Sequence, residues 1–123
     1  MVDNAWSNQN AYQMSATFVI NHLENGVRLE FKTRTDRIPL FIKIFTNVAE
    51  ANECIKMLQE EIKPDRFRVY MSKKRKYTFE VRCKGGNTLL ESHPYLKCQS
   101  AWRGAYSMIR TMRQAGIKEV SYH

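Results

Sequence analysis

Cysteine is scarce and scattered in this sequence. Cys54, Cys83 and Cys98 form an odd set with wide spacing, no Cys-x-x-Cys pair is present, and no histidine stands near a cysteine in a zinc-binding pattern. This usage is typical of reduced thiols, so we expect a cytoplasmic protein.

Long apolar segments and a secretory start are also missing. The longest apolar tract, Ile38–Phe45, is interrupted by Lys43 and is far shorter than a membrane span. The N-terminus has neither the basic start nor the apolar core of a signal peptide. We therefore expect no membrane partner, and we interpret residues 1–15, which are rich in Asn, Gln and Ser, as a flexible tail.

The sequence contains none of the common motifs of catalysis or cofactor binding. There is no glycine-rich phosphate loop, no paired-acid motif and no His-Glu metal motif, and His22, His93 and His123 have no recognisable partner. These absences predict a protein that is not an enzyme and has no catalytic residue, bound metal or cofactor.

Acidic residues are scarce in the second half of the chain. Residues 1–63 hold 7 Lys and Arg against 8 Asp and Glu, whereas residues 64–123 hold 13 against 4. The formal net charge of +8 therefore arises from the second half. Such asymmetry indicates a polyanionic partner, most often nucleic acid, and the alternative is a basic surface that only keeps the protein in solution.

Apolar residues make up 43% of the chain, which is enough to build a core, and their spacing predicts regular elements. Alternation predicts three strands within residues 16–45, the first two joined by a hairpin at Asn25–Gly26. A helix follows, since Asn47 and Glu50 have the spacing of a capping box and the apolar residues after them recur on one face.

The second half repeats this order at an offset of 50 residues, with matches such as Leu29 to Phe79, Phe45 to Tyr95, Ala51 to Ala101 and Cys54 to Gly104. We therefore predict an α+β fold in which tandem β-β-β-α(-β) repeats form a single unit over residues 16–123. The repeats span about 16–63 and 64–123, and they are expected to build one antiparallel sheet with two helices on one face.

Residues 66–109 carry an ungapped pattern of aromatic, small and apolar residues: Phe67, Tyr77, Phe79, Val81, Gly86, Leu89, Leu90, Ser92, Tyr95, Ser100, Ala101, Gly104, Ser107 and Met108. This pattern resembles that of the YegP-like family, small bacterial tandem-repeat domains of unknown function, whereas the first half resembles it only in outline. The resemblance implies two β(3)-α-β units that form a single sheet and exchange their last strands, with 117–123 as the exchanged strand here. It implies no activity.

The chain departs from this family pattern in three places. The first hairpin of the second repeat has cations where the family has glycine, Lys97 is a poor helix cap where the family has serine, and Trp102 stands where the family has small polar or charged residues. The resemblance therefore supports the fold, and any function has to come from the residues themselves.

The predicted second helix, "SAWRGAYSMIRTMR" at residues 100–113, has two different faces. One face is small and apolar and is expected to pack closely on the sheet: Ala101, Gly104, Ala105, Met108 and Met112. The other carries a stripe of Arg103, Tyr106, Arg110 and Arg113 with Trp102 beside it. Arginine binds phosphates through paired hydrogen bonds and aromatic rings stack on unpaired bases, but a solvated face explains the stripe equally well.

Four consecutive cations are predicted to lie in a hairpin turn of the second repeat: Lys73, Lys74, Arg75 and Lys76. An external anion would relieve their repulsion, although edge lysines also prevent aggregation of sheets.

These features predict a non-enzymatic binding module that contacts nucleic acid through the basic second half. The candidate site residues are Trp102, Arg103, Tyr106, Arg110, Arg113, Lys73, Lys74, Arg75 and Lys76. The alternative is a protein-interaction module, such as a small inhibitor or adaptor, that uses the Trp/Tyr/Arg face of the second helix. The sequence leaves open which partner is bound and whether the protein forms a homodimer.

Overall fold

The computed structural model describes residues 15–121 of the chain. The expected flexible tail over residues 1–15 lies outside the described residues except for Ser15.

The first repeat is an antiparallel meander followed by a helix. It contains β1 (Ala16–Leu23), β2 (Gly26–Thr33), β3 (Phe41–Phe45) and α2 (Val48–Glu60). The predicted hairpin is confirmed, with Gly26 as the first residue of β2. Glycine is required there because its φ is +155° and a Cβ would lie 2.6 Å from the carbonyl oxygen of Phe45.

The predicted start of α2 is also confirmed. The Asn47 side chain accepts a hydrogen bond from the backbone N–H of Glu50 at 2.9 Å. The Glu50 carboxylate accepts one from the N–H of Thr46, also at 2.9 Å. Two N–H groups at the start of the helix thus gain partners, as in a capping box.

The second repeat has the same order and adds a final strand. Its elements are η1 (Pro64–Arg66), β4 (Phe67–Ser72), η2 (Lys73–Arg75), β5 (Lys76–Arg82), β6 (Thr88–Glu91), α3 (Cys98–Thr111), η3 (Met112–Gln114) and β7 (Gly116–Val120). As expected for a poor cap, the side chain of Lys97 makes no hydrogen bond to the start of α3.

The prediction of one sheet is wrong, because the strands form two sheets. The first has the order β3-β2-β1-β7 and the second the order β4-β5-β6. They meet at β3 and β6, where Phe41 and Ser92 form an isolated bridge and the N–H of His93 donates to the carbonyl of Leu40 at 3.2 Å. Further along, the ammonium group of Lys43 donates to the carbonyl of Leu89, so a side chain takes the place of a backbone donor and the pairing ends.

The last strand of the second repeat joins the sheet of the first. β7 pairs with β1 from Thr17–Gly116 to Asn21–Val120, which is the exchange that the family resemblance implies. The pair is parallel, so the expectation of a wholly antiparallel sheet is also wrong. The reason is that β7 follows a long helical crossover, which allows a parallel arrangement, rather than a tight turn.

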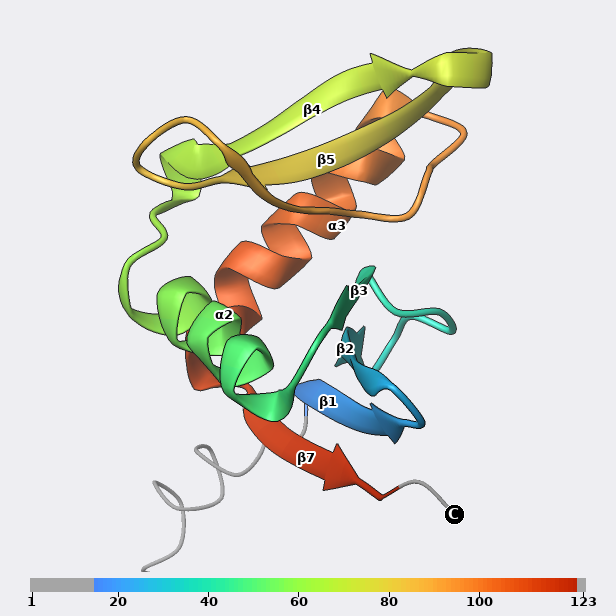
Figure 1. Ribbon diagram of the computed structural model, residues 1–123. Coiled ribbons are helices and arrows are strands. Elements are labelled where there is room, and N and C mark those ends of the chain that lie inside the picture. The colour runs from blue at the N-terminus through green and yellow to red at the C-terminus, as the bar shows by residue number, and fades with distance from the viewer. Residues whose placement is uncertain (1–14, 122–123) are drawn as a thin grey trace, which may run out of the picture.

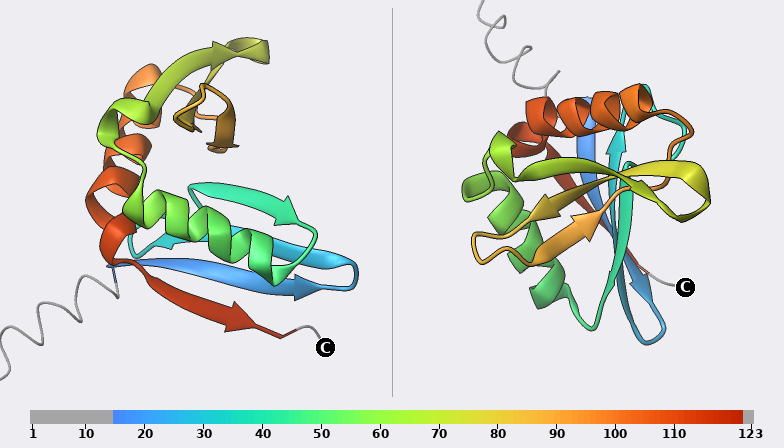
Figure 2. Two further views of the ribbon diagram at one scale, coloured as in Figure 1. Left: turned by 60° about the vertical axis from the view of Figure 1, so that its left-hand side comes forward. Right: turned by 90° about the horizontal axis from the view of Figure 1, so that it is seen from above.

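The helices do not share one face of one sheet as predicted; each packs against its own sheet. α2 contacts β1, β2 and β3, whereas α3 contacts β4 and β5 and runs from the second sheet toward the first (Figure 1). Both sheets and both helices contribute to a common core that includes Phe18, Phe31, Leu58, Phe79 and Met108. Figure 2 shows α2 lying across the first sheet and α3 standing beside both.

The predicted inner face of α3 is confirmed, since Ala101, Gly104, Ala105, Met108 and Met112 are all buried. Over residues 15–121, no helix has both the length and the apolar character needed to cross a membrane.

Candidate binding site

The outward side of α3 does not form one uniform stripe. Arg103 and Arg110 line a hollow on one flank, Trp102 and Tyr106 stack on the other, and Arg113 bonds to the end of the first repeat. The sequence-predicted residues therefore separate into groups with different roles.

The hollow beside Arg103 and Arg110, here called the α3 hollow, has a volume of about 310 Å³. It lies between α3, the loop that follows β2 and the segment that leads into α3. Its lining residues are Thr35, Asp36, Tyr95, Ser100, Arg103, Gly104, Ser107 and Arg110. Polar groups from three separate parts of the chain thus converge on one concave surface.

Tyr95 is held rigidly at this hollow. Its backbone N–H and carbonyl both bond to the backbone of Tyr77 at 2.7 Å, and its ring lies 6.5 Å from that of Phe79 and 4.2 Å from that of His93. Its hydroxyl is buried and has no hydrogen-bond partner among residues 15–121. Burial, together with the negative charge of Asp36, raises the pKa of Tyr95 to about 12, so the hydroxyl is protonated at neutral pH.

Asp36 is the acidic group of the α3 hollow. Its carboxylate accepts a hydrogen bond from the hydroxyl of Thr33, and its own N–H donates to that hydroxyl at 3.2 Å. Within the described part of the chain, the side chains of Arg103 and Arg110 have no ion pair or hydrogen bond. Two arginines against one aspartate leave the hollow positive, which suits an anionic group that also offers hydrogen-bond donors.

The aromatic pair lies on the other flank of α3. The rings of Trp102 and Tyr106 have centroids 5.6 Å apart and planes 27° apart. Trp102 is partly buried against the core, whereas Tyr106 is 52% exposed. Trp102 therefore lies between the core and Tyr106, and Tyr106 is the more accessible ring of the pair.

Arg113 does not join the other arginines. Its guanidinium donates a hydrogen bond to the carbonyl of Ile62 at 3.1 Å, which ties η3 to the end of the first repeat. Its role in the structure is to connect the two repeats.

The four cations after β4 form the predicted turn, here called the basic hairpin. Lys73–Arg75 are η2 and Lys76 begins β5, with the hydroxyl of Ser72 donating to the carbonyl of Lys76 at 2.9 Å. Lys74 and Arg75 have φ of 68° and 58°, the left-handed region where glycine is favoured. Figures 1 and 2 show the basic hairpin at the same end of the molecule as the start of α3.

The cations of the second half are poorly neutralised. Among residues 15–121, the ion pairs join His22 to Glu119, Glu30 to Arg28 and Lys32, and Glu80 to Arg82. Arg82 is thus the one Lys or Arg of residues 64–121 that has an ion pair within the described part of the chain. The excess charge seen in the sequence is therefore not neutralised by ion pairs within the described residues.

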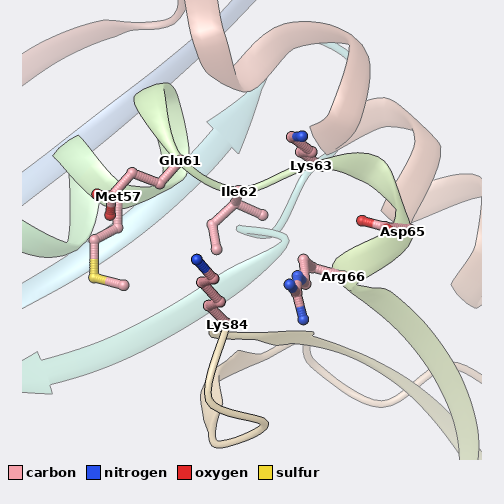
Figure 3. A pocket seen from close by; sticks show the side chains of 7 residues that line it. All are labelled: Met57, Glu61, Ile62, Lys63, Asp65, Arg66 and Lys84. Carbon is pink, nitrogen blue, oxygen red and sulfur yellow. The ribbon is translucent and has the colours of Figure 1, made fainter.

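A larger hollow of about 480 Å³ lies where the end of α2, η1 and the turn after β5 meet. Figure 3 shows Lys84 pointing toward Ile62, with Arg66 beside it. Lys63, Arg66 and Lys84 share this hollow with Glu61 and Asp65, so acids stand among its cations. No buried side-chain polar atom without a partner is found there among the described residues, which makes it a weaker candidate than the α3 hollow.

The sequence interpretation missed part of the α3 hollow. Ser100 and Ser107 could have been found, because Ser100, Arg103, Ser107 and Arg110 follow the spacing of one helix flank. Thr35 and Asp36 could not, since they lie in an irregular loop that only the folded chain brings to α3.

The groups that could support catalysis or metal binding are dispersed. Burial raises the pKa of the Cys54 thiol to about 11, Cys83 is partly buried and Cys98 is exposed. Over the residues that the structure describes, no three His, Cys, Asp or Glu side chains are grouped so that they could hold a metal ion.

Comparison of folds identifies two similar solved structures. The solution NMR structure of yegP, a protein of unknown function from E. coli, has a TM-score of 0.77 and 16% identity, covering 89% of this chain and 97% of that one. The solution NMR structure of a UPF0339 protein from Shewanella oneidensis has a TM-score of 0.74 and 16% identity, covering 88% and 93%. No family model and no curated protein matches the sequence. The resemblance inferred from residues 66–109 is therefore confirmed as a shared fold.

Proposed function

We propose that this chain is a non-enzymatic binding module that contacts nucleic acid through a surface made by Arg103, Tyr106, Arg110 and the basic hairpin. The observation that carries the proposal is the lack of neutralisation: the second half holds 13 Lys and Arg, and the structure pairs just Arg82 among those in the described residues. Cations that have no ion pair in the protein are free to bind phosphates. Each such contact raises the affinity for nucleic acid by releasing condensed counterions.

The chemistry of the surface favours single-stranded nucleic acid. Arg103 and Arg110 offer planar guanidinium groups to phosphates, and the exposed ring of Tyr106 offers a platform on which an unpaired base can stack. Such a combination binds strands with little sequence preference.

The test is a salt titration of binding to a labelled single-stranded oligonucleotide. Replacing both Arg103 and Arg110 by Gln should weaken binding and reduce the slope of log K against log salt by about 1.4, because each phosphate contact on a single strand contributes about 0.7. The control replaces Arg68 and Lys118, two exposed cations of the second half outside this surface. An equal loss in the control would reject this surface, and absence of binding at low salt would reject the function.

The stacked pair supports the alternative of a protein-interaction module. An exposed tyrosine beside arginines is typical of interface hot spots, and Tyr106 is such a residue. Under this alternative, Tyr106→Ala abolishes capture of a protein partner, capture survives nuclease treatment, and affinity changes little between low and high salt. Under nucleic-acid binding, nuclease treatment removes the capture and affinity falls steeply as salt rises, whereas Tyr106→Ala weakens binding under either hypothesis.

A further inference from the structure

The hydroxyl of Tyr95 packs against Gly104 of α3 but has no hydrogen-bond partner among the described residues. At the corresponding position of the first repeat the chain has Phe45, which does without a hydroxyl. In the second repeat the hydroxyl is buried and accepts or donates no hydrogen bond within residues 15–121. An unpaired buried hydroxyl is unfavourable, so its presence at the edge of a polar hollow points to a group that is bound there.

The surroundings of Tyr95 narrow the chemistry of that group. Arg103 and Arg110 lie seven residues apart on α3, two helical turns, with Ser100 and Ser107 on the same flank. These side chains are donors suited to phosphate oxygens. Asp36, on the loop that faces them, is an acceptor suited to a hydroxyl.

We propose that the α3 hollow holds the terminal phosphate and adjoining sugar of a nucleotide, which extends the nucleic-acid binding proposed above. Arg103 and Arg110 bind the phosphate, and the Tyr95 hydroxyl donates to it or to a water that it holds. Asp36 accepts a hydrogen bond from a sugar hydroxyl. The volume of about 310 Å³ lies at the lower end of small-molecule sites, so it suits the end of a strand or a free mononucleotide rather than a length of chain.

The experiment compares the same short single strand with a 5′-phosphate and with a 5′-hydroxyl, labelled at the 3′ end, and adds AMP as a free mononucleotide. We expect the phosphorylated strand to bind about tenfold more tightly at equal salt. Arg103→Gln and Arg110→Gln should each abolish this preference, and Tyr95→Phe should reduce it. Arg68→Gln, an exposed position of β4 outside the hollow, should leave the preference intact.

The arms of this experiment distinguish a strand end from a free nucleotide as the source of the phosphate. They also test the nucleotide site separately from the nucleic-acid function. If AMP shifts the NMR amide signals of Gly104 and Ser107 and displaces the phosphorylated strand, the site accepts a free nucleotide as well as a strand end. If AMP shifts these signals but neither strand binds, the nucleotide site stands and the nucleic-acid function fails. If both strands bind equally and AMP shifts nothing, the nucleotide site is overturned and the nucleic-acid function stands. A thermal melt of each variant verifies that it is folded.

Discussion

The hydroxyl of Tyr95 occupies the space that a side chain at position 104 would need. A Cβ on Gly104 would lie 2.9 Å from Cζ of Tyr95 and 3.3 Å from Cε2 of Phe79, and closer still to the hydroxyl. The equivalent residues of the first repeat are Phe45 and Cys54, a smaller ring on the strand side and a larger residue in the helix. Tyr95 and Gly104 thus form a matched pair that distinguishes the second repeat.

This relationship predicts coupling between the two positions. Gly104→Ala adds helix propensity worth about 1 kcal/mol, but the overpacking against Tyr95 costs about 1–3 kcal/mol, so we expect net destabilisation. In the Tyr95→Phe background the hydroxyl is gone and the ring can tilt, so the same change should cost less than half as much. Urea denaturation of the two single variants and the double variant measures the coupling. Additive effects would mean that the two residues do not compete for space.

A larger side chain at position 104 gives the strongest effect. Gly104→Leu should force α3 away from β5 and unfold or severely destabilise the protein, because Phe79 and Tyr95 together close that side of the helix. Ser107→Leu, one turn away on the flank of the α3 hollow, is the matched control and should keep the fold. A stable Gly104→Leu variant with a normal melt would show that the helix–sheet contact is not tight.

Changes at Arg110 of α3 and Arg113 of η3 should affect binding and stability separately. Arg113→Gln removes the hydrogen bond to the Ile62 carbonyl and should lower the free energy of unfolding by about 1 kcal/mol, while binding of a single strand stays near that of the wild type. Arg110→Gln should do the reverse. Thermal melts beside binding titrations check both variants. If Arg113→Gln weakens binding as much as Arg110→Gln without a change in stability, the original stripe of four residues was the better interpretation.

Local sequence patterns predicted most of the helices and strands, because these elements depend mainly on residues that are neighbours in the chain. The hairpin at Gly26, the cap at Asn47 and the buried face of α3 were all predicted in this way. The division into two sheets was not, because it depends on where β6 ends and on the contact of Lys43 with the Leu89 carbonyl between β3 and β6.

Alternation also failed to predict which outward residues are shielded from solvent. Glu30 and Glu80 occupy equivalent outward positions of the two repeats, yet they are only 5% and 6% exposed. Arg28 and Arg82 each lie across one of them with a 2.7 Å hydrogen bond to its carboxylate. Of the residues that line the α3 hollow, only Arg103 and Arg110 were predicted as site residues, for a similar reason: Asp36 reaches the hollow through the fold and not through any sequence spacing.

Stability should fall at high pH because of Tyr95. Its pKa in the folded protein is about 12, above the ordinary value of 10, through burial and then the charge of Asp36. The unfolded chain therefore loses the proton first, and stability that is complete below pH 10 is lost as the pH rises toward 12. Between pH 10 and pH 11, ionisation of this group lowers the free energy of unfolding by about 1 kcal/mol.

Urea denaturation at pH 9 and pH 11 measures this loss. Tyr95→Phe should show a smaller fall in the free energy of unfolding than the wild type, and Asp36→Asn an intermediate one because the burial remains. An equal fall in wild type and Tyr95→Phe would assign the alkaline loss to other groups, such as Tyr70, whose pKa is also raised to about 12 by burial and by its hydrogen bond to Glu91.

The cations of the basic hairpin should lower the stability of the protein while they strengthen binding to a single strand. Lys74 and Arg75 both have positive φ, which costs a non-glycine residue about 1–2 kcal/mol relative to ordinary backbone, and Asn-Gly is the sequence that such a two-residue turn favours. The double change Lys74→Asn and Arg75→Gly should therefore stabilise the protein by about 1 kcal/mol. It should also weaken binding to a single strand and lower the salt slope by about 1.4, because two phosphate contacts are lost.

A matched variant, Lys73→Gln with Lys76→Gln, removes the same charge at positions without positive φ. It should weaken binding similarly without raising the melting temperature. If Lys74→Asn with Arg75→Gly raises stability and weakens binding, the two cations contribute to binding at the expense of stability. If Lys74→Asn with Arg75→Gly stabilises the protein and binds as the wild type does, the turn is only a charged edge that discourages pairing between sheets.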